Sequence, residues 1–231
     1  MIKVVCFDFY NTLATYEPSR EEVYAHACHE LGMTVEPKTF AKSLPAADTF
    51  YRDENARSPI DKRPQEEKFA FYAEYGIRIF KGAGVEIDRQ TAFQIMAKLQ
   101  KLSWKFKAYD DSLPTLKTLK NRGLTLGIIS NVIQDMEATY QELGLQPYLD
   151  FKVTSSEVGC DKPKPEIFLA ALNKAKAKPT ETLYVGDQYD VDIVGARNVG
   201  IKAVLLDRND WLTDITDCPR IRTLPQIVEY I

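Results

Sequence analysis

The sequence has only four cysteines among its 231 residues, and they show neither a CxxC pair nor zinc-finger spacing. Cys6, Cys28, Cys160 and Cys218 are therefore expected to be reduced thiols of an intracellular protein. A long apolar run is also missing, because the N-terminal stretch reaches Asp8 after only a few apolar residues. This stretch is too short for a signal peptide or a membrane span, so we expect a cytoplasmic protein without a membrane partner.

An excess of one charge is absent as well. Thirty Lys and Arg stand against thirty-three Asp and Glu, which gives a net charge of -3 without a long block of one sign. Because nucleic-acid binders carry a basic patch or stripe, we predict no nucleic-acid partner. A small anionic substrate would have to be held by local charges, and nothing in the sequence indicates the oligomeric state.

Two patterns of hydrophobic spacing divide the chain. Residues 3–9 form a nearly continuous apolar run, typical of a strand buried on both faces of a parallel sheet. Between Pro18 and Phe106, apolar residues recur at three- and four-residue spacings within residues 21–32, 66–84 and 89–106, which predict helices there and no strand in the whole stretch. After Ala108, strands and helices are predicted to alternate: strands 125–130, 151–154, 182–185 and 202–206, and helices 112–121, 134–143, 165–175 and 190–199.

The first strand needs a sheet that only the second half of the chain supplies. We therefore predict an α/β fold with a Rossmann-like, doubly wound parallel sheet core, formed by residues 1–15 and 108–231. An all-helical domain, residues 16–107, would be inserted after the first strand. In such sheets, ligands bind at the carboxyl ends of the strands, where the direction of winding reverses.

Polar clusters follow four of the predicted strands. They are Asp8 with Thr12, Ser130 with Asn131, Lys162 with Lys164, and Asp187 with Asp192.

A carboxylate at the position of Asp8 can act as a nucleophile or as a metal ligand. Together with Asp187 and Asp192 it gives the oxygen-only set that Mg²⁺ prefers. A lysine of the DKPKP segment would neutralise a phosphoryl group, and the hydroxyls of Thr12 and Ser130 would donate hydrogen bonds to it.

Asn131 would also donate a hydrogen bond to the phosphoryl group, or it would orient the substrate. Each cluster alone also has an ordinary explanation as a helix cap, a turn or a loop before a helix. Four clusters of compatible chemistry at one edge of the sheet favour a site for phosphoryl transfer. In the helical region, the basic residues of the stretch YRDENARSPIDKRP could reach an anionic substrate or form a solvated connection: Arg52, Arg57, Lys62 and Arg63.

The segments FDFYNTL, IISN, KPKPEIF and VGDQYDVDIVGA resemble, in order and over the whole chain, the four motifs of the haloacid dehalogenase-like (HAD) hydrolase superfamily. The helical insert resembles the cap domain of the first type in that superfamily. Residues 109–131 and 150–159 are similar to the branch that includes the rhythmically expressed gene 2-like proteins. The resemblance implies a Mg²⁺-dependent phosphatase that forms an aspartyl-phosphate intermediate on a small phosphate ester.

The same resemblance implies a role for each site residue, and it favours Lys162 over Lys164. The implied roles are Asp8 as nucleophile, Lys162 as the neutralising cation, Thr12, Ser130 and Asn131 at the substrate phosphate, and Asp8, Asp187, Asp192 and the backbone carbonyl of Tyr10 as Mg²⁺ ligands.

Tyr10 departs from the phosphatase pattern, which usually has a second aspartate here as general acid and base. A tyrosine resembles the dehalogenase branch, in which a carboxylate attacks carbon without a metal, so a 2-haloacid dehalogenase is one alternative. Against it stand the two carboxylates of the fourth motif, Asn11 in place of a glycine, and Phe168 in place of a tyrosine. The other alternative is a binding or regulatory protein that retains the site but turns over poorly.

Overall fold

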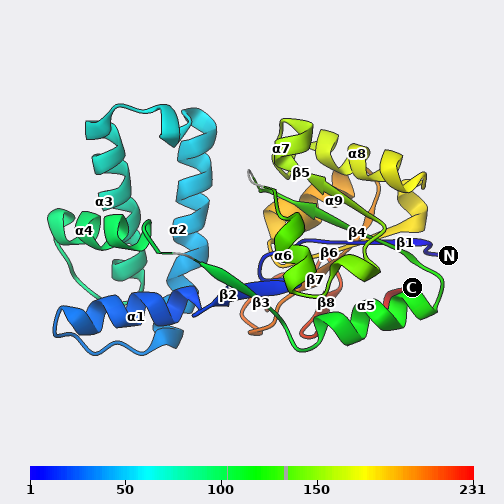
Figure 1. Cartoon of the computed structure of the whole chain (residues 1–231), viewed down its shortest axis with the longest axis horizontal. Helices are drawn as coiled ribbons and strands as arrows, with labels where there is room; N and C mark the ends of the chain where they lie inside the picture. The colour runs from blue at the N-terminus through cyan, green and yellow to red at the C-terminus, as the bar shows by residue number, and fades with distance from the viewer. Residues whose placement is uncertain (103, 133–134) are drawn as a thin grey trace. The chain divides into compact units, whose positions relative to one another are not determined.

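The computed structural model describes residues 1–231 with the exception of 103, 133 and 134. The chain divides into two compact units, Met1–Thr15 with Phe106–Ile231 and Tyr16–Lys105. We call them the sheet unit and the helical unit (Figure 1). In the described part of the chain, no helix is long and apolar enough to cross a membrane.

The sheet unit contains a six-stranded sheet, which confirms the predicted α/β fold. All neighbouring strands are parallel, in the order β5-β4-β1-β6-β7-β8. The chain runs from β1 through β4 to β5 on one side and then returns to β6 on the other side of β1. The winding therefore reverses at β1, and a ligand site is expected at the carboxyl ends of β1, β4 and β6. The strands are β1 (Val4–Phe7), β4 (Thr125–Ser130), β5 (Phe151–Thr154), β6 (Thr182–Gly186), β7 (Lys202–Leu206) and β8 (Arg220–Ile221).

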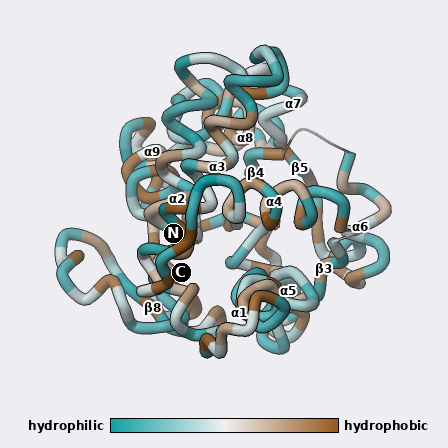
Figure 2. The backbone as a smooth tube through the Cα atoms, turned by 90° about the vertical axis from the view of Figure 1, so that its left-hand side faces the viewer, coloured by the Kyte–Doolittle hydropathy of each residue, from teal (hydrophilic) through white to brown (hydrophobic). Residues whose placement is uncertain are grey.

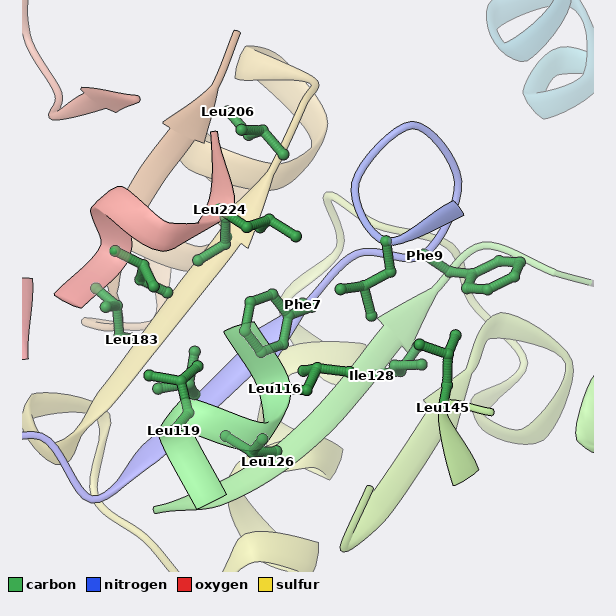
Figure 3. Packing of buried hydrophobic residues seen from close by; sticks show 14 of the residues in the cluster. Phe7, Phe9, Leu116, Leu119, Leu126, Ile128, Leu145, Leu183, Leu206 and Leu224 are labelled. Carbon is green, nitrogen blue, oxygen red and sulfur yellow. The ribbon is translucent and has the colours of Figure 1, made fainter. Parts of the chain in front are cut away.

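Strand β1 is buried on both faces because its side chains alternate between two hydrophobic clusters. Val5 and Phe7 pack in one cluster, and Val4 and Cys6 pack in the other. Helix α5 (Ser112–Asn121) and the 3₁₀ segment η5 (Leu224–Tyr230) contribute to the first cluster, where Figure 3 shows Phe7 with Leu116, Leu119 and Leu224. Helices α8 (Pro165–Ala175) and α9 (Val194–Asn198) contribute to the second.

The helical unit has its own hydrophobic core, which includes Tyr24, Phe40 and Phe80. Ser19 and Glu22 form a capping box at the start of α1, and Asp88 caps α4. Hydrophobic and hydrophilic stretches alternate along the tube in Figure 2, as expected of helices with one buried side. The helices are α1 (Arg20–Glu30), α2 (Pro37–Arg57), η1 (Ile60–Lys62), α3 (Gln65–Gly82) and α4 (Arg89–Leu99).

The structure corrects several predicted boundaries. The helix predicted to reach Phe106 ends at Leu99, and Lys105–Ala108 form strand β3, which pairs with β2 (Ala14–Glu17). Exposed and half-buried residues alternate along β3, which is the two-residue period of a strand rather than of a helix. The prediction that no strand occurs up to Phe106 was therefore wrong at this end.

Two further helices differ from the predicted ones in the sheet unit. The helix predicted over 134–143 is α6 (Glu137–Glu142), while residue 134 lies outside the described residues. The helix predicted over 190–199 begins as a π-helical turn, η4 (Tyr189–Ile193), before it continues as α9. The remaining short elements are η2 (Gln146–Tyr148), α7 (Ser155–Val158) and η3 (Pro179–Glu181).

Candidate active site

Asp8 directly follows β1 and begins a tight loop. Its backbone N–H donates to the carbonyl of Val185 in β6 (2.8 Å), and its side chain lies in the interior with only 5% of the residue exposed. The carbonyl of Phe9 then accepts the N–H groups of residues 12, 13 and 14, at 3.3, 2.9 and 3.0 Å. Asn11 sits at the apex with φ of 60°, a left-handed conformation that asparagine tolerates better than most residues. The loop thereby turns the chain back beside Asp8.

Lys162 joins three polar side chains at the centre of the site. Its Nζ donates to Asp8 Oδ1 (2.6 Å), to Asp192 Oδ1 (2.7 Å) and to Tyr184 Oη (2.8 Å). These bonds use all three protons of the ammonium group. Lys164, the other lysine of the segment, is exposed, so the structure places only Lys162 beside Asp8.

Asn131 holds the backbone of Lys162. The N–H of Lys162 donates to Asn131 Oδ1 (2.7 Å), and Asn131 Nδ2 donates to the carbonyl of Lys162 (3.0 Å). The loop is also tightly packed against α9, because a Cβ atom at Gly195 would lie 3.0 Å from Pro163 Cα. Asn131 therefore fixes the position of the lysine, whereas its predicted contact with the substrate phosphate stays a prediction.

Asp192 reaches the same centre because of its local backbone. A Cβ atom at Gly186 would lie 2.4 Å from the carboxyl group of Asp192, so only glycine lets that carboxylate approach the end of β6. The N–H of Asp192 donates to the carbonyl of Gln188 (2.8 Å), and the N–H of Gln188 donates to Asp192 Oδ2 (3.0 Å). The π-helical turn and this reciprocal pair aim the fully buried carboxylate at Lys162.

Three carboxylates meet in this place. Oxygen atoms of Asp8, Asp187 and Asp192 all lie within 4.8 Å of one another. Asp187 Oδ1 is buried and has no hydrogen-bond partner among the described residues. An oxygen-only set with one unsatisfied buried oxygen fits a divalent ion such as Mg²⁺.

The charges of the site do not balance, since one ammonium faces three carboxylates. Burial raises the pKa of Asp8 to about 6, although the charge of Lys162 opposes this. Burial also raises the pKa of Asp187 well above its usual range, and the charges of Asp8 and Asp192 add to this effect. Burial would lower the pKa of Lys162, but Asp192 and Asp8 outweigh it and keep the lysine charged. A bound cation would stabilise the ionised forms of Asp8 and Asp187.

Tyr184 was not predicted to belong to this site. It is a fully buried residue of β6 whose hydroxyl accepts the bond from Lys162 and faces Asp192 Oδ1 (3.0 Å) and the carbonyl of Ile129 (3.3 Å). The only signal in the sequence is a hydroxyl within an apolar strand, three residues before Asp187. Such a tyrosine must find polar partners inside the protein, but the sequence does not indicate which ones.

The other predicted residues lie at the same end of the sheet. Thr12 is fully buried, and its Oγ1 has no hydrogen-bond partner among the described residues. Ser130 is the last residue of β4 and is 3% exposed. Tyr10 forms an isolated bridge with Ala14 in the loop after Asp8. The structure thus brings the four clusters of the sequence to one edge of the sheet, while the role of each residue stays a prediction.

The basic residues predicted as possible anion contacts in the helical unit bond mainly within that unit. Arg57 donates to Glu54 Oε1 (3.0 Å), and Arg63 donates to Glu54 Oε2 (3.2 Å) and to the carbonyl of Ser58 (2.8 Å). Arg52 donates to Thr49 Oγ1 (3.1 Å). The bond of Arg57 therefore lies within α2, whereas Arg63 ties the end of α2 to the segment that follows it. Lys62 is exposed and is the last residue of η1.

Comparison with known proteins gives one family and several relatives. A family model described as haloacid dehalogenase-like hydrolase matches residues 2–200. Haloacid dehalogenase-like hydrolase domain-containing protein 3 of Homo sapiens is 30% identical, over 100% of this chain and 92% of its own length. Ribulose-1,5-bisphosphate 5-phosphatase of Halopiger xanaduensis is 28% identical, over 91% of this chain and 87% of its own.

Among solved structures, the HAD hydrolase YfnB of Bacillus subtilis, determined with bound magnesium, has the same fold. It matches with a TM-score of 0.66 and 17% identity, over 99% of this chain and 98% of its own.

Proposed function

The chain belongs to the haloacid dehalogenase-like hydrolase family and is a hydrolase, and from this premise we propose that it is a Mg²⁺-dependent phosphatase acting on a small phosphate ester through Asp8. One observation carries the proposal. Three carboxylates lie together, a single lysine bonds to two of them, and the buried Oδ1 of Asp187 has no partner among the described residues. Such a site is short of positive charge, and Mg²⁺ with a phosphate ester supplies the cation and a ligand for it.

The proposed reaction has two steps, both at phosphorus. A carboxylate oxygen of Asp8 attacks, the bond from phosphorus to the ester oxygen breaks, and the leaving alkoxide takes a proton from water. A water molecule then attacks the aspartyl phosphate, the bond between Asp8 and phosphorus breaks, and inorganic phosphate leaves. Bound Mg²⁺, held by Asp8, Asp187, Asp192 and the Tyr10 carbonyl, would neutralise charge on the phosphoryl oxygens.

Residues of the chain provide the remaining functions. Lys162 holds one oxygen of Asp8 at 2.6 Å, which gives the nucleophile one orientation and adds positive charge beside the transferring group. The hydroxyl groups of Thr12 and Ser130 donate hydrogen bonds to phosphoryl oxygens. Asn131 contributes by fixing the backbone of Lys162, and we propose that its second amide proton is donated to the substrate phosphate.

The relatives support this choice of substrate class. The Halopiger protein is a phosphatase of a sugar bisphosphate, and two archaeal relatives at 36% and 38% identity over about half of this chain are glyceraldehyde 3-phosphate phosphatases. The magnesium in the Bacillus hydrolase supports the cofactor. We also assign the chain to the branch of the rhythmically expressed gene 2-like proteins, on the similarity of residues 109–131 and 150–159.

Tyr10 supports the alternative of a 2-haloacid dehalogenase, in which Asp8 would attack carbon and displace halide. Asp187 argues against it, because its Oδ1 is buried without a partner among the described residues and a metal-free reaction gains nothing from a third carboxyl group at this place. Phe168, which stands in place of the dehalogenase tyrosine, has no hydroxyl to supply. It is fully buried and packs edge-on against Tyr184, with the ring centroids 5.5 Å apart. Because Tyr10 also stands where family phosphatases have an aspartate, no carboxylic acid is present there to protonate the leaving group. We therefore expect fast turnover only with good leaving groups.

A paired assay tests the proposal. Phosphate release from p-nitrophenyl phosphate, whose leaving group needs little protonation, is measured for the wild type and Asp8→Asn with Mg²⁺ and with a chelator. Halide release from 2-chloropropionate is measured beside it. Phosphate release that requires both Asp8 and Mg²⁺ supports the phosphatase, and metal-independent halide release supports the dehalogenase. If wild type and Asp8→Asn are equally inactive, the chain is the weak binding or regulatory protein instead.

A further inference from the structure

Arg208 lies two residues beyond β7 and bonds to the loop that carries the nucleophile. Its Nη2 donates to the backbone carbonyl of Thr12 (2.8 Å), and Nη1 and Nη2 both donate to the carboxylate of Asp111 (3.0 Å each). The guanidinium also lies over the ring of Tyr109, with Cζ 3.9 Å from the ring centroid. Only 17% of the Arg208 side chain and 19% of the Asp111 side chain are exposed. A planar fork that stacks on a ring is a geometry that lysine cannot provide.

The segment on which Arg208 rests holds the same loop from a second direction. The carbonyl of Leu13 accepts the hydroxyl proton of Ser112 (2.7 Å) and the N–H of Tyr109 (3.1 Å). Asp111, which precedes α5, makes no capping bond to that helix and instead accepts from Arg208 and from the N–H of Leu224 (3.0 Å). Arg208 therefore joins the loop to residues 109–112, and Asp111 extends this connection to the start of η5.

Thr12 depends on these backbone bonds. Its Oγ1 is buried and has no hydrogen-bond partner among the described residues, so no side-chain bond orients the hydroxyl. The position of Oγ1 follows from the position of the Thr12 backbone, and the carbonyl of that residue is the group that Arg208 holds.

We propose that Arg208 is a positioning residue, which holds the Thr12 hydroxyl where it meets the phosphoryl group. The inference rests on the proposed phosphatase function, because that function provides the phosphoryl group that the Thr12 hydroxyl would contact. Arg208 acts through the loop, because its hydrogen bonds go to Thr12 and Asp111 and to none of the metal-site carboxylates. Its partners also adjoin both strands that lead between the units, since Thr12 stands two residues before β2 and Tyr109 directly follows β3. One side chain thus fixes the sheet-unit ends of these two strands together with the phosphate-binding hydroxyl.

A double-mutant cycle tests whether Arg208 acts through Thr12. Arg208→Gln and Arg208→Lys are assayed for p-nitrophenyl phosphate hydrolysis with Mg²⁺, and Arg208→Gln is also combined with Thr12→Ala. We expect each Arg208 variant to lower kcat about 10- to 100-fold, because a small misplacement of a catalytic group has an effect of that size. In the Thr12→Ala background, Arg208→Gln should lower kcat by less than about twofold.

The control is Arg197→Gln, which removes an exposed arginine bonded to Asp217 at 2.7 Å in the same unit and should leave kcat unchanged. The Mg²⁺ concentration for half-maximal activity should change by less than about twofold in the Arg208 variants, since Arg208 bonds to none of the metal-site carboxylates. A purely structural role would lower kcat equally in both Thr12 backgrounds, and that result would overturn the inference. So would an unchanged kcat in Arg208→Gln.

Hydrogen exchange on the whole protein gives a readout that needs no activity. The N–H groups of residues 12, 13 and 14 bond to the carbonyl of Phe9 and should exchange faster in Arg208→Gln, but not in Arg197→Gln. If these amides respond while the wild type releases no phosphate, the positioning stands and the proposed function fails. If the wild type is active and these amides exchange at the wild-type rate in Arg208→Gln, the positioning fails and the proposed function stands.

Discussion

In the helical unit, Arg20 bonds to one carboxylate, whereas Lys162 in the sheet unit bonds to two and a third lies beside them. Arg20 Nη1 and Nη2 donate to Asp48 Oδ2 and Oδ1 at 2.6 and 2.9 Å, and the hydroxyl of Tyr75 donates to Asp48 Oδ1 at 2.6 Å. Although burial opposes ionisation, Arg20 and the hydrogen bonds keep the pKa of Asp48 below its usual value. One cation balances one anion, and their polar atoms are bonded to each other.

The cluster around Lys162 has the opposite character. Burial raises the pKa of Asp8 and Asp187 above their usual values, and Asp187 has a buried oxygen without a partner among the described residues. A balanced, bonded pair such as Arg20 and Asp48 joins α1 to α2, and its loss would leave a charge inside without a partner. An unbalanced cluster costs stability in the free protein, and a ligand of the opposite charge relieves that cost. The difference separates a structural ion pair from a functional site.

The largest expected effect comes from removing one carboxylate in each unit. Asp8→Asn should lower phosphate release by at least about 10⁴-fold, because the nucleophile is lost. It should not lower the free energy of unfolding, since it removes one of three like charges. Asp48→Asn should do the reverse and lower the free energy of unfolding by about 2–4 kcal/mol, because Arg20 stays partly buried without its partner. Denaturant unfolding and phosphate release measure the two effects. Equal losses of stability in the two variants would contradict the distinction between a structural ion pair and a functional site.

Metal removal should reveal the cost of the unbalanced charge. The pKa of Asp8 is raised from 3.8 to about 6 in the folded protein, so its ionisation destabilises the fold. In the metal-free protein, the contribution of Asp8 to stability is complete below about pH 4 and falls by about 2–3 kcal/mol as the pH rises through 6. The difference in unfolding free energy between wild type and Asp8→Asn, measured against pH, isolates this contribution. Mg²⁺ should abolish the fall, and a difference that does not change with pH would contradict the charge imbalance.

The variant Tyr10→Asp tests whether the absence of a carboxylic acid at this position limits turnover to good leaving groups. The new carboxylic acid should raise kcat for an alkyl phosphate such as glycerol phosphate by about 10²-fold or more, because it can protonate the alkoxide. Hydrolysis of p-nitrophenyl phosphate, whose leaving group needs little protonation, should change much less. Tyr10→Phe is the matched control and should leave the ratio of the two rates unchanged. A uniform change with both substrates would show that Tyr10 does not set the leaving-group requirement.

The smallest effect is expected from removing one hydroxyl in each cluster. Tyr184→Phe takes a hydrogen bond from Lys162 and another from Asp192, and should lower kcat about tenfold through the lost positioning of both. Tyr75→Phe removes the corresponding hydroxyl beside Asp48 and should lower the melting temperature while kcat stays unchanged. Steady-state kinetics and thermal unfolding of the two variants provide the check. If kcat falls in Tyr75→Phe and not in Tyr184→Phe, the roles assigned to the two clusters are wrong.

Much of the sheet unit could be predicted because its elements are short apolar runs that end at polar or turn-forming residues. The bounds of β4, β5, β7, α5 and α8 agree with those predicted from spacing alone. Helix α2 was not among the predicted segments, and Pro45 lies inside it, where local propensity argues against a helix. The two-residue β8 is formed by pairing with β7, which no local pattern shows.

The residues of the site could also be predicted only where a local pattern marks them. Strand ends could be located in the sequence, so Asp8, Lys162 and Asp192 were expected at one edge, and the structure brings them together. Tyr184 and Arg208 were missed because their importance lies in bonds to residues far away along the chain. The bond from Arg208 to Thr12, for example, spans 196 positions. No local pattern marks an arginine that holds a distant carbonyl.

The most direct test of the central claim is to trap the phosphorylated enzyme. Wild type and Asp8→Asn are mixed with p-nitrophenyl phosphate and Mg²⁺, quenched in acid within the first turnover and digested for mass spectrometry. The wild-type peptide that contains Asp8 should gain the mass of one phosphoryl group, whereas neither the chelator-treated enzyme nor Asp8→Asn should do so. Phosphate release without any phosphorylated Asp8, or a phosphoryl group on another residue, would contradict the proposed mechanism.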